Sequence, residues 1–165
     1  MIRHSIALDP DKARSSGLSD DERPLTRPGN QRARGVACGL RLLLQDSPVN
    51  VILTSPLLRA RQTAAIVADY LGNPPVDETE ALVPTTTMEA IDTELHRHFG
   101  AQRVILVGHE PSLSRWLTWS LTRHHDRFAS LQTGSAALLD FPGAPEGGTG
   151  ALHWLLTPEQ LDALA

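Results

Sequence analysis

Apolar residues recur along the chain at helical spacing in some stretches and in short unbroken runs in others. A spacing of three and four residues from Ala33 to Leu44 predicts a helix over 27–45 that begins after Thr26. Similar spacing predicts further helices over 56–71, from Thr86 or Thr87 to 99–100, over 111–121 and over 158–165. Short apolar runs predict strands over 1–6, 49–54, 103–107, 136–141 and 151–156.

The segments between these stretches are polar or rich in glycine and proline. Residues 7–24 are expected to form a loop, and residues 80–83 are expected to be extended. In the 56–71 helix, Ser55 is the expected N-cap and Pro56 the first helical residue. The acidic stretch 19–22 is typical of a solvated loop.

Strands that alternate with helices predict a three-layer α/β/α sandwich with a mainly parallel central sheet. A length of 165 residues suits a single domain over 1–165. Ligands of such sheets bind just beyond the carboxyl ends of the strands. Polar residues follow three predicted strands, at Arg3-His4, Ser55 to Arg59 and Gly108-His109, and the functional site is therefore expected among them.

Composition excludes several classes of partner. The net charge is −4 and no basic block is present, which argues against nucleic acid as a partner. No run of about 18 apolar residues exists to span a membrane. The opening residues Met1 to His4 contain a charged side chain where a signal peptide would be apolar, so a cytoplasmic location is expected. The single Cys38 lies in a helical apolar pattern and is interpreted as a packing residue.

The histidine pattern does not favour a metal site. His96 and His98 are two residues apart on a predicted helix, so they point to different faces. The segment 124–126 is a polar loop, and His109-Glu110-Pro111 lacks the second histidine of a zinc-binding helix. We therefore expect neither a metal nor another cofactor.

Each polar segment at a strand end is weak evidence alone, but together they supply a defined chemistry. His4 offers an imidazole nucleophile, Arg3 and Arg59 offer two guanidinium groups, and His109 offers a second imidazole. Arg59 also lies in the first turn of a predicted helix, where the backbone dipole favours an anion. This set is suited to binding and transferring a phosphoryl group.

These segments resemble the motifs of the histidine phosphatase superfamily, whose fold is phosphoglycerate mutase-like, and in particular its short SixA-type phosphohistidine phosphatase branch. The resemblance covers nearly the whole chain, and its nine-residue motif at 55–63 is the most specific part. The matching segments are Arg3-His4-Ser5, Arg23-Pro24-Leu25-Thr26 with Gly29, Ser55 to Thr63, Val107-Gly108-His109-Glu110-Pro111, and the closing segments 136–139 and 152–154.

The resemblance implies that His4 is the nucleophile, that Arg3 and Arg59 bind the phosphoryl oxygens, and that His109 stabilises the transition state. It implies a metal-independent phosphatase that forms a phosphohistidine intermediate on His4. The expected substrate is phosphohistidine in a protein or peptide, and the product is phosphate. The alternatives are a small-molecule phosphomonoesterase, a mutase-branch enzyme and a non-catalytic phosphate-binding module.

The chain departs from the family pattern at three points. Ser5 stands where the signature has glycine. Only two residues precede Arg3, so we expect a short first strand that four or five additional apolar residues would stabilise. The acidic proton donor of the larger branches has no clear counterpart, and Glu80, Glu110 and Glu22 are the candidates.

Overall fold

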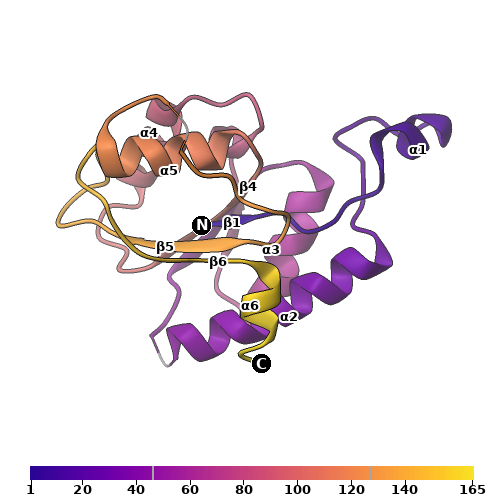
Figure 1. The fold of residues 1–165 in the computed structure, drawn as a ribbon, viewed down its shortest axis with the longest axis horizontal. Coiled ribbons are helices and arrows are strands. Elements are labelled where there is room, and N and C mark those ends of the chain that lie inside the picture. Colours follow the sequence, from indigo (N-terminus) through magenta and orange to yellow (C-terminus); the bar gives the residue numbers. More distant parts are fainter. Residues whose placement is uncertain (46, 127) are drawn as a thin grey trace.

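The computed structural model describes residues 1–45, 47–126 and 128–165 (Figure 1). Within these residues six strands form one sheet: β1 (Ile2–Arg3), β2 (Val51–Thr54), β3 (Val76–Glu78), β4 (Val104–Gly108), β5 (Ala136–Asp140) and β6 (Ala151–Leu156). The helical elements are α1 (Pro10–Ser15), α2 (Arg27–Leu44), α3 (Leu58–Tyr70), the 3-10 helix η1 (Glu80–Leu82), α4 (Met88–Arg97), α5 (Ser112–Thr122) and α6 (Pro158–Asp162).

The order of strands across the sheet is β3-β2-β4-β1-β5-β6. The first four of these are mutually parallel, whereas β5 is antiparallel to both β1 and β6. The sheet is therefore mixed, with a parallel part that holds the three predicted site segments. Its flanking helices give the phosphoglycerate mutase-like α/β fold that the sequence predicts. The described residues include no helix that is long and apolar enough to cross a membrane.

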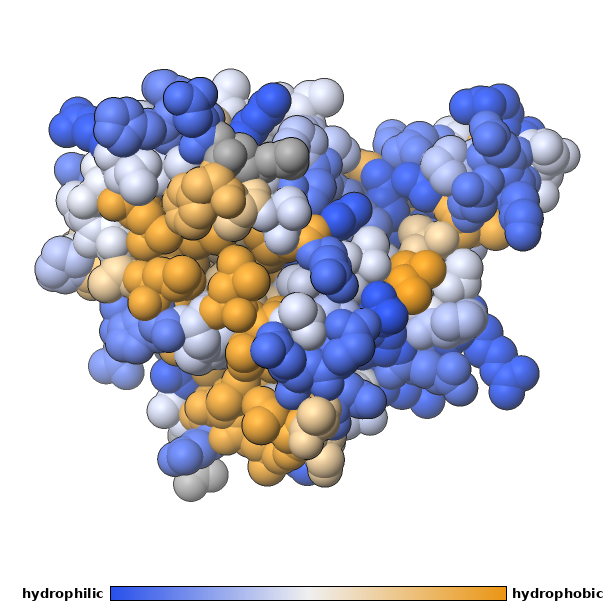
Figure 2. Space-filling view, in the orientation of Figure 1, coloured by the Kyte–Doolittle hydropathy of each residue, from blue (hydrophilic) through white to orange (hydrophobic). Residues whose placement is uncertain are grey.

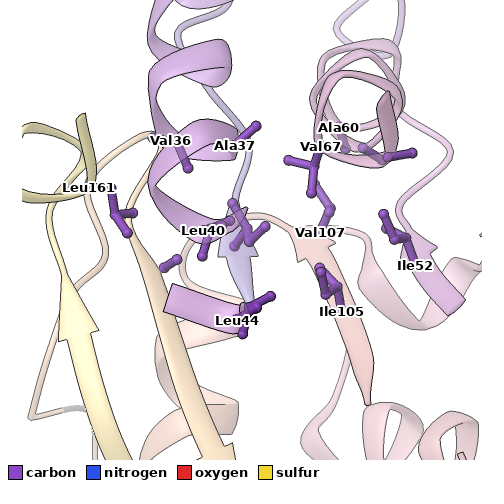
Figure 3. Close-up of a cluster of buried hydrophobic side chains, with 14 residues drawn as sticks. Val36, Ala37, Leu40, Leu44, Ile52, Ala60, Val67, Ile105, Val107 and Leu161 are labelled. Carbon is purple, nitrogen blue, oxygen red and sulfur yellow. The ribbon is translucent and has the colours of Figure 1, made fainter. Parts of the chain in front are cut away.

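Side chains of the central strands alternate between two hydrophobic clusters, one on each face of the sheet. Ile52 and Ile105 lie in a cluster that contains α2, α3 and α6, and Figure 3 shows these side chains between the helices and the strands. Leu53 and Leu106 lie in the second cluster, which contains residues of α4 and α5. This period-two alternation fixes the register of the strands, and with it the positions of their carboxyl ends.

Contact between α2 and α6 depends on Gly39, and Gly39→Ala is expected to destabilise the protein. Alanine is the better helix former by about 1 kcal/mol. However, a Cβ at position 39 would lie 2.1 Å from the backbone oxygen of Leu161, which is fully buried. Because α6 must then move, we expect a net loss of about 1–3 kcal/mol in the free energy of unfolding, measured with urea.

Gly143→Ala is the matched control, because a Cβ at Gly143 meets nothing within 4 Å. Equal stability of the Gly39 and Gly143 variants would contradict the close approach of α2 and α6.

The segment 7–24, predicted as a loop, contains helix α1, so that prediction was wrong in part. Asp9 caps the helix because its side chain accepts hydrogen bonds from the backbone of Asp11 and Lys12, and proline occupies the first helical position. Helix α1 extends away from the sheet in Figure 1, and its surface is mostly hydrophilic in Figure 2. With only Ala13 buried, α1 has almost no apolar periodicity to reveal it.

The structure also corrects the extended segment predicted over 80–83. The strand lies earlier, at β3, where it pairs with β2 from Val76 to Glu78. Residues 80–82 instead form η1, which begins where the Thr79 side chain accepts a hydrogen bond from the backbone of Ala81. Strand β3 is exposed at the sheet edge and so lacks the apolar run that marks a buried strand.

Candidate active site

The predicted site residues come together at the carboxyl ends of adjacent parallel strands. Arg3 ends β1 and His4 follows it, while His109 follows β4. The backbone N–H of His4 donates to the carbonyl of Gly108 (3.0 Å), and the two imidazole rings lie 4.9 Å apart between centroids. Arg59 projects from the first turn of α3, just after β2, and its charge acts on both histidines. The structure thus brings all four residues to one site.

His4 is held as a neutral imidazole with one defined tautomer. Its Nδ1 lies 2.7 Å from the carbonyl oxygen of Ser5, which can only accept, so Nδ1 carries the proton. The Nε2 atom therefore keeps its lone pair. Burial is the main cause that lowers the pKa of His4 to about 4; the hydrogen bond to Ser5 opposes this shift, and the positive charges of Arg59 and Arg3 contribute to it. A neutral imidazole is the form that can attack phosphorus.

We expect His4 to stay neutral well into the acidic range. Because the folded state disfavours the imidazolium, protonation should occur near pH 4 and not near the ordinary value of about 6.5. The measurement is a titration of the His4 ring by NMR in the free protein, from pH 8 down to the lowest pH at which the protein stays folded. A midpoint above pH 6 for His4 would contradict the burial argument.

His109 is held by Ser55, which follows β2. The His109 Nε2 and the Ser55 hydroxyl are 2.9 Å apart, and the same hydroxyl accepts a hydrogen bond from the backbone of Leu57. When the hydroxyl donates its proton to Nε2, the His109 Nδ1 carries a hydrogen. That buried Nδ1 has no partner among the described residues. The pKa of His109 is lowered to about 2, chiefly by burial and next by the electrostatic effect of His4. His109 is therefore neutral and can act as a hydrogen-bond donor.

Ser55 was predicted to cap α3, and the structure corrects this. The helix begins at Leu58, and the backbone N–H of Leu58 donates to the carbonyl of Asp21 (2.9 Å). The loop after α1 thus supplies the contact that the sequence assigned to Ser55. The Ser55 hydroxyl is consequently available to His109.

Each of the two arginines donates a hydrogen bond from Nη1 to a backbone carbonyl and also has a buried Nε–H group. Arg3 donates from Nη1 to the carbonyl of Leu131 (2.5 Å), and Arg59 donates from Nη1 to the carbonyl of Asp20 (2.7 Å). The Nε atoms of Arg3 and Arg59 are buried, and no described residue accepts from them. Burial lowers the pKa of both guanidinium groups, which nevertheless remain charged at neutral pH.

Three buried donors without partners are therefore present in one site: the two arginine Nε groups and the His109 Nδ1. A buried donor that lacks an acceptor costs free energy, so native proteins rarely leave one unless a ligand or water accepts from it. Two of these donors belong to guanidinium groups. An anion with several acceptor oxygens would satisfy all three.

Sequence reasoning missed the role of Asp20, which was interpreted as part of a solvated loop. Its carboxylate lies 3.0 Å from Nη2 of Arg59 and 2.8 Å from Nε of Arg23. These two arginines hold the pKa of Asp20 below its ordinary value, against the opposing effect of partial burial. Asp20 thus holds both Nη atoms of Arg59, and its charge also acts on His109. The available sequence signal is its position three residues before Arg23, the first residue of a motif segment.

The three candidate proton donors are placed differently. Glu22 is exposed and accepts from the backbone and hydroxyl of Ser19, and these hydrogen bonds lower its pKa. Glu110 accepts from the Ser114 hydroxyl (2.6 Å), and its charge raises the pKa of Arg3. Glu80 is exposed at the start of η1. Glu22 is therefore ionised and fixed to its own loop, and Glu110 supports a site arginine.

Among the described residues, no group of three or more His, Cys, Asp or Glu side chains is arranged to hold a metal ion.

The family model described as the histidine phosphatase superfamily (branch 1) matches residues 1–84. The chain belongs to this superfamily. An uncharacterized protein of Picosynechococcus sp. (strain PCC 7002) is 38% identical over 129 residues, which cover 75% of this chain and 74% of that protein.

Two solved structures are similar to this chain over almost its full length. The protein histidine phosphatase SixA, solved in complex with tungstate, has a TM-score of 0.80 and 26% identity, covering 97% of this chain and 96% of its own. A phosphoserine phosphatase from Entamoeba histolytica, in complex with 3-phosphoglyceric acid, has a TM-score of 0.66 and 16% identity, covering 97% and 96%. The second likeness concerns the fold alone. Superfamily membership and the SixA-like fold support phosphatase activity.

Proposed function

We propose that residues 1–165 form a single metal-independent phosphatase domain in which His4 carries the phosphoryl group as a covalent intermediate. The observation that supports this most directly is the state of His4: it is neutral, its Nδ1–H is bonded to Ser5, and its Nε2 keeps a lone pair. The three unpartnered donors of Arg3, Arg59 and His109 lie in the same site, where phosphoryl oxygens would accept from them.

The reaction has two steps. The Nε2 lone pair of His4 forms a bond to phosphorus while the bond from phosphorus to the leaving group breaks, and the leaving group takes up a proton. Water then attacks the phosphorus of the phosphohistidine, the Nε2–phosphorus bond breaks, and inorganic phosphate is released. Arg3, Arg59 and His109 donate to the three equatorial oxygens, whose negative charge must be neutralised in a loose transition state.

Phosphohistidine on a protein or peptide is the substrate that this site suits best. An imidazole leaving group can be protonated before the nitrogen–phosphorus bond breaks, whereas an alkoxide needs a placed acid. Glu22 is ionised, and Glu110 accepts hydrogen bonds from Ser114 and Leu131, so neither is poised to protonate an alkoxide. The likeness to SixA, described as a protein histidine phosphatase, supports the same substrate class.

The test compares kcat/KM for a phosphohistidine peptide with kcat/KM for phosphoserine and phosphotyrosine peptides and for small phosphomonoesters, in one buffer. We expect the phosphohistidine peptide to be hydrolysed with the highest kcat/KM. A tenfold preference for any phosphomonoester would refute this substrate and favour a small-molecule phosphatase. Binding of phosphate without turnover of any of these compounds would favour a phosphate-binding module.

A further inference from the structure

Ser5 makes three hydrogen bonds to three different parts of the site, and its side chain is fully buried. Its carbonyl accepts from Nδ1 of His4 (2.7 Å), its backbone N–H donates to the hydroxyl of Thr63 in α3 (3.1 Å), and its own hydroxyl donates to the carbonyl of Gly29 in α2 (2.7 Å). The residue whose carbonyl orients the proposed nucleophile is thus held by contacts to both neighbouring helices.

Only the third of these bonds requires a side chain. The superfamily signature has glycine at this position, and glycine could make the first two bonds through its backbone alone. The serine hydroxyl therefore adds a contact from the His4 segment to the first turn of α2. That turn is close enough to receive it, because a Cβ at Gly29 would lie 1.9 Å from the backbone oxygen of Ile6. Glycine at position 29 permits this approach.

The Thr63 contact links the preceding peptide, between His4 and Ser5, to the helix that carries Arg59. The Thr63 hydroxyl donates to the carbonyl of Arg59 (2.8 Å) while it accepts from the N–H of Ser5. Thr63 is buried, so its hydroxyl has little competition from water. Ser5 therefore connects the proposed nucleophile to the helical turn that presents a phosphate-binding guanidinium.

We propose that Ser5 is a positioning residue for His4, acting through its hydroxyl to hold its own carbonyl against Nδ1. This proposal rests on the proposed function, in which His4 attacks phosphorus. When the hydroxyl bond to Gly29 is present, the Ser5 peptide plane is fixed, and the His4 ring keeps its proton on Nδ1 and its lone pair on Nε2. When that bond is lost, the carbonyl can tilt, and the proton of His4 can redistribute between the two ring nitrogens.

The principal test replaces Ser5 with alanine, which removes the hydroxyl and keeps the Cβ. We expect kcat for a phosphohistidine peptide to fall on the order of tenfold, because small displacements of a reacting group are costly. KM should change less than about twofold, because Arg3 and Arg59 are unaltered. In NMR of the free protein at pH 7, the wild type should show a proton on His4 Nδ1 only, and Ser5→Ala should show a mixture of tautomers.

Ser120→Ala is the matched control, because Ser120 is also buried and its hydroxyl also donates to a helix carbonyl, that of Trp116. It should retain the wild-type kcat and the wild-type state of His4. A second variant covers the case in which Ser5→Ala does not fold. Ser5→Cys keeps a similar side-chain shape but replaces the hydroxyl with a weak donor, so it should reproduce the loss in kcat and the mixed tautomer.

The proposal is overturned if Ser5→Ala, or Ser5→Cys where Ser5→Ala does not fold, keeps the wild-type kcat and a single His4 tautomer. This result is distinct from failure of the proposed function. The tautomer is read in the free protein, whereas the proposed function fails if the wild type forms no phosphohistidine on His4. Formation of that intermediate together with an unaltered Ser5→Ala variant would reject the role of Ser5 alone.

Discussion

Replacement of His4 with alanine is expected to reduce turnover of a phosphohistidine peptide to less than about one thousandth of the wild-type kcat. The covalent step needs a neutral nitrogen nucleophile directed at phosphorus, and alanine offers none. His109 does not substitute, because its Nε2 is bonded to Ser55. The measurement is kcat under substrate saturation, with the thermal midpoint recorded for each protein.

The fold should survive this change, because within the described residues the His4 side chain hydrogen bonds only to its neighbour Ser5 and packs against His109. His96→Ala, at an exposed position on α4, is the control and should keep the wild-type kcat. Turnover of His4→Ala within tenfold of the wild type would remove His4 from the mechanism. An unfolded variant would be recognised by its lost thermal transition, and His4→Asn would then replace it.

The second large effect is expected for Arg59→Ala, which should lower kcat/KM by a factor between about 30 and 1000. This range corresponds to about 2–4 kcal/mol of lost transition-state stabilisation, the magnitude found when one preorganised donor is removed. The Arg59 guanidinium is buried, and its Nε has no acceptor within the described structure. Asp20 holds the two Nη atoms, and the Nε–H remains as the donor for a phosphoryl group. The measurement is kcat/KM for the phosphohistidine peptide.

Arg61→Ala is the control for this variant, because Arg61 lies on the same helix but pairs with Glu78 at the surface. Its kcat/KM should remain within about twofold of the wild type, since exposed ion pairs contribute little. Loss of Arg59 also leaves Asp20 without one partner, but Asp20 is 57% exposed and keeps Arg23. A decrease of less than tenfold for Arg59→Ala would count against its proposed role.

The parts of the fold with buried apolar faces could be predicted from sequence. The α2 helix and the β4 strand were expected within one residue of their observed bounds, because each buries a continuous apolar face against the sheet. Helix α1 and strand β3 were missed for the opposite reason. The former buries one residue and the latter buries none, so neither leaves a hydrophobic pattern.

The residues of the candidate site also include some that the sequence pattern predicts and some that it does not. Arg3, His4, Arg59 and His109 could be predicted because each stands next to a strand that can be recognised in the sequence. The residues that hold these four side chains in place could not be predicted. Asp20 reaches Arg59 across 39 residues from an exposed loop.

The Ser5 hydroxyl reaches Gly29 across 24 residues. Such contacts depend on how the loop after β1 lies against α2 and α3. Local propensity does not encode that arrangement.

Direct detection of a phosphohistidine on His4 tests the central claim. Enzyme is mixed with radiolabelled phosphohistidine peptide, quenched within milliseconds, and divided between acid and alkaline treatment before the labelled residue is mapped. We expect label on the peptide that contains His4, stable in alkali and lost in acid, formed no more slowly than kcat and absent from His4→Ala. Steady release of phosphate by the wild type, with no label on His4 at any quench time, would contradict covalent catalysis by this residue.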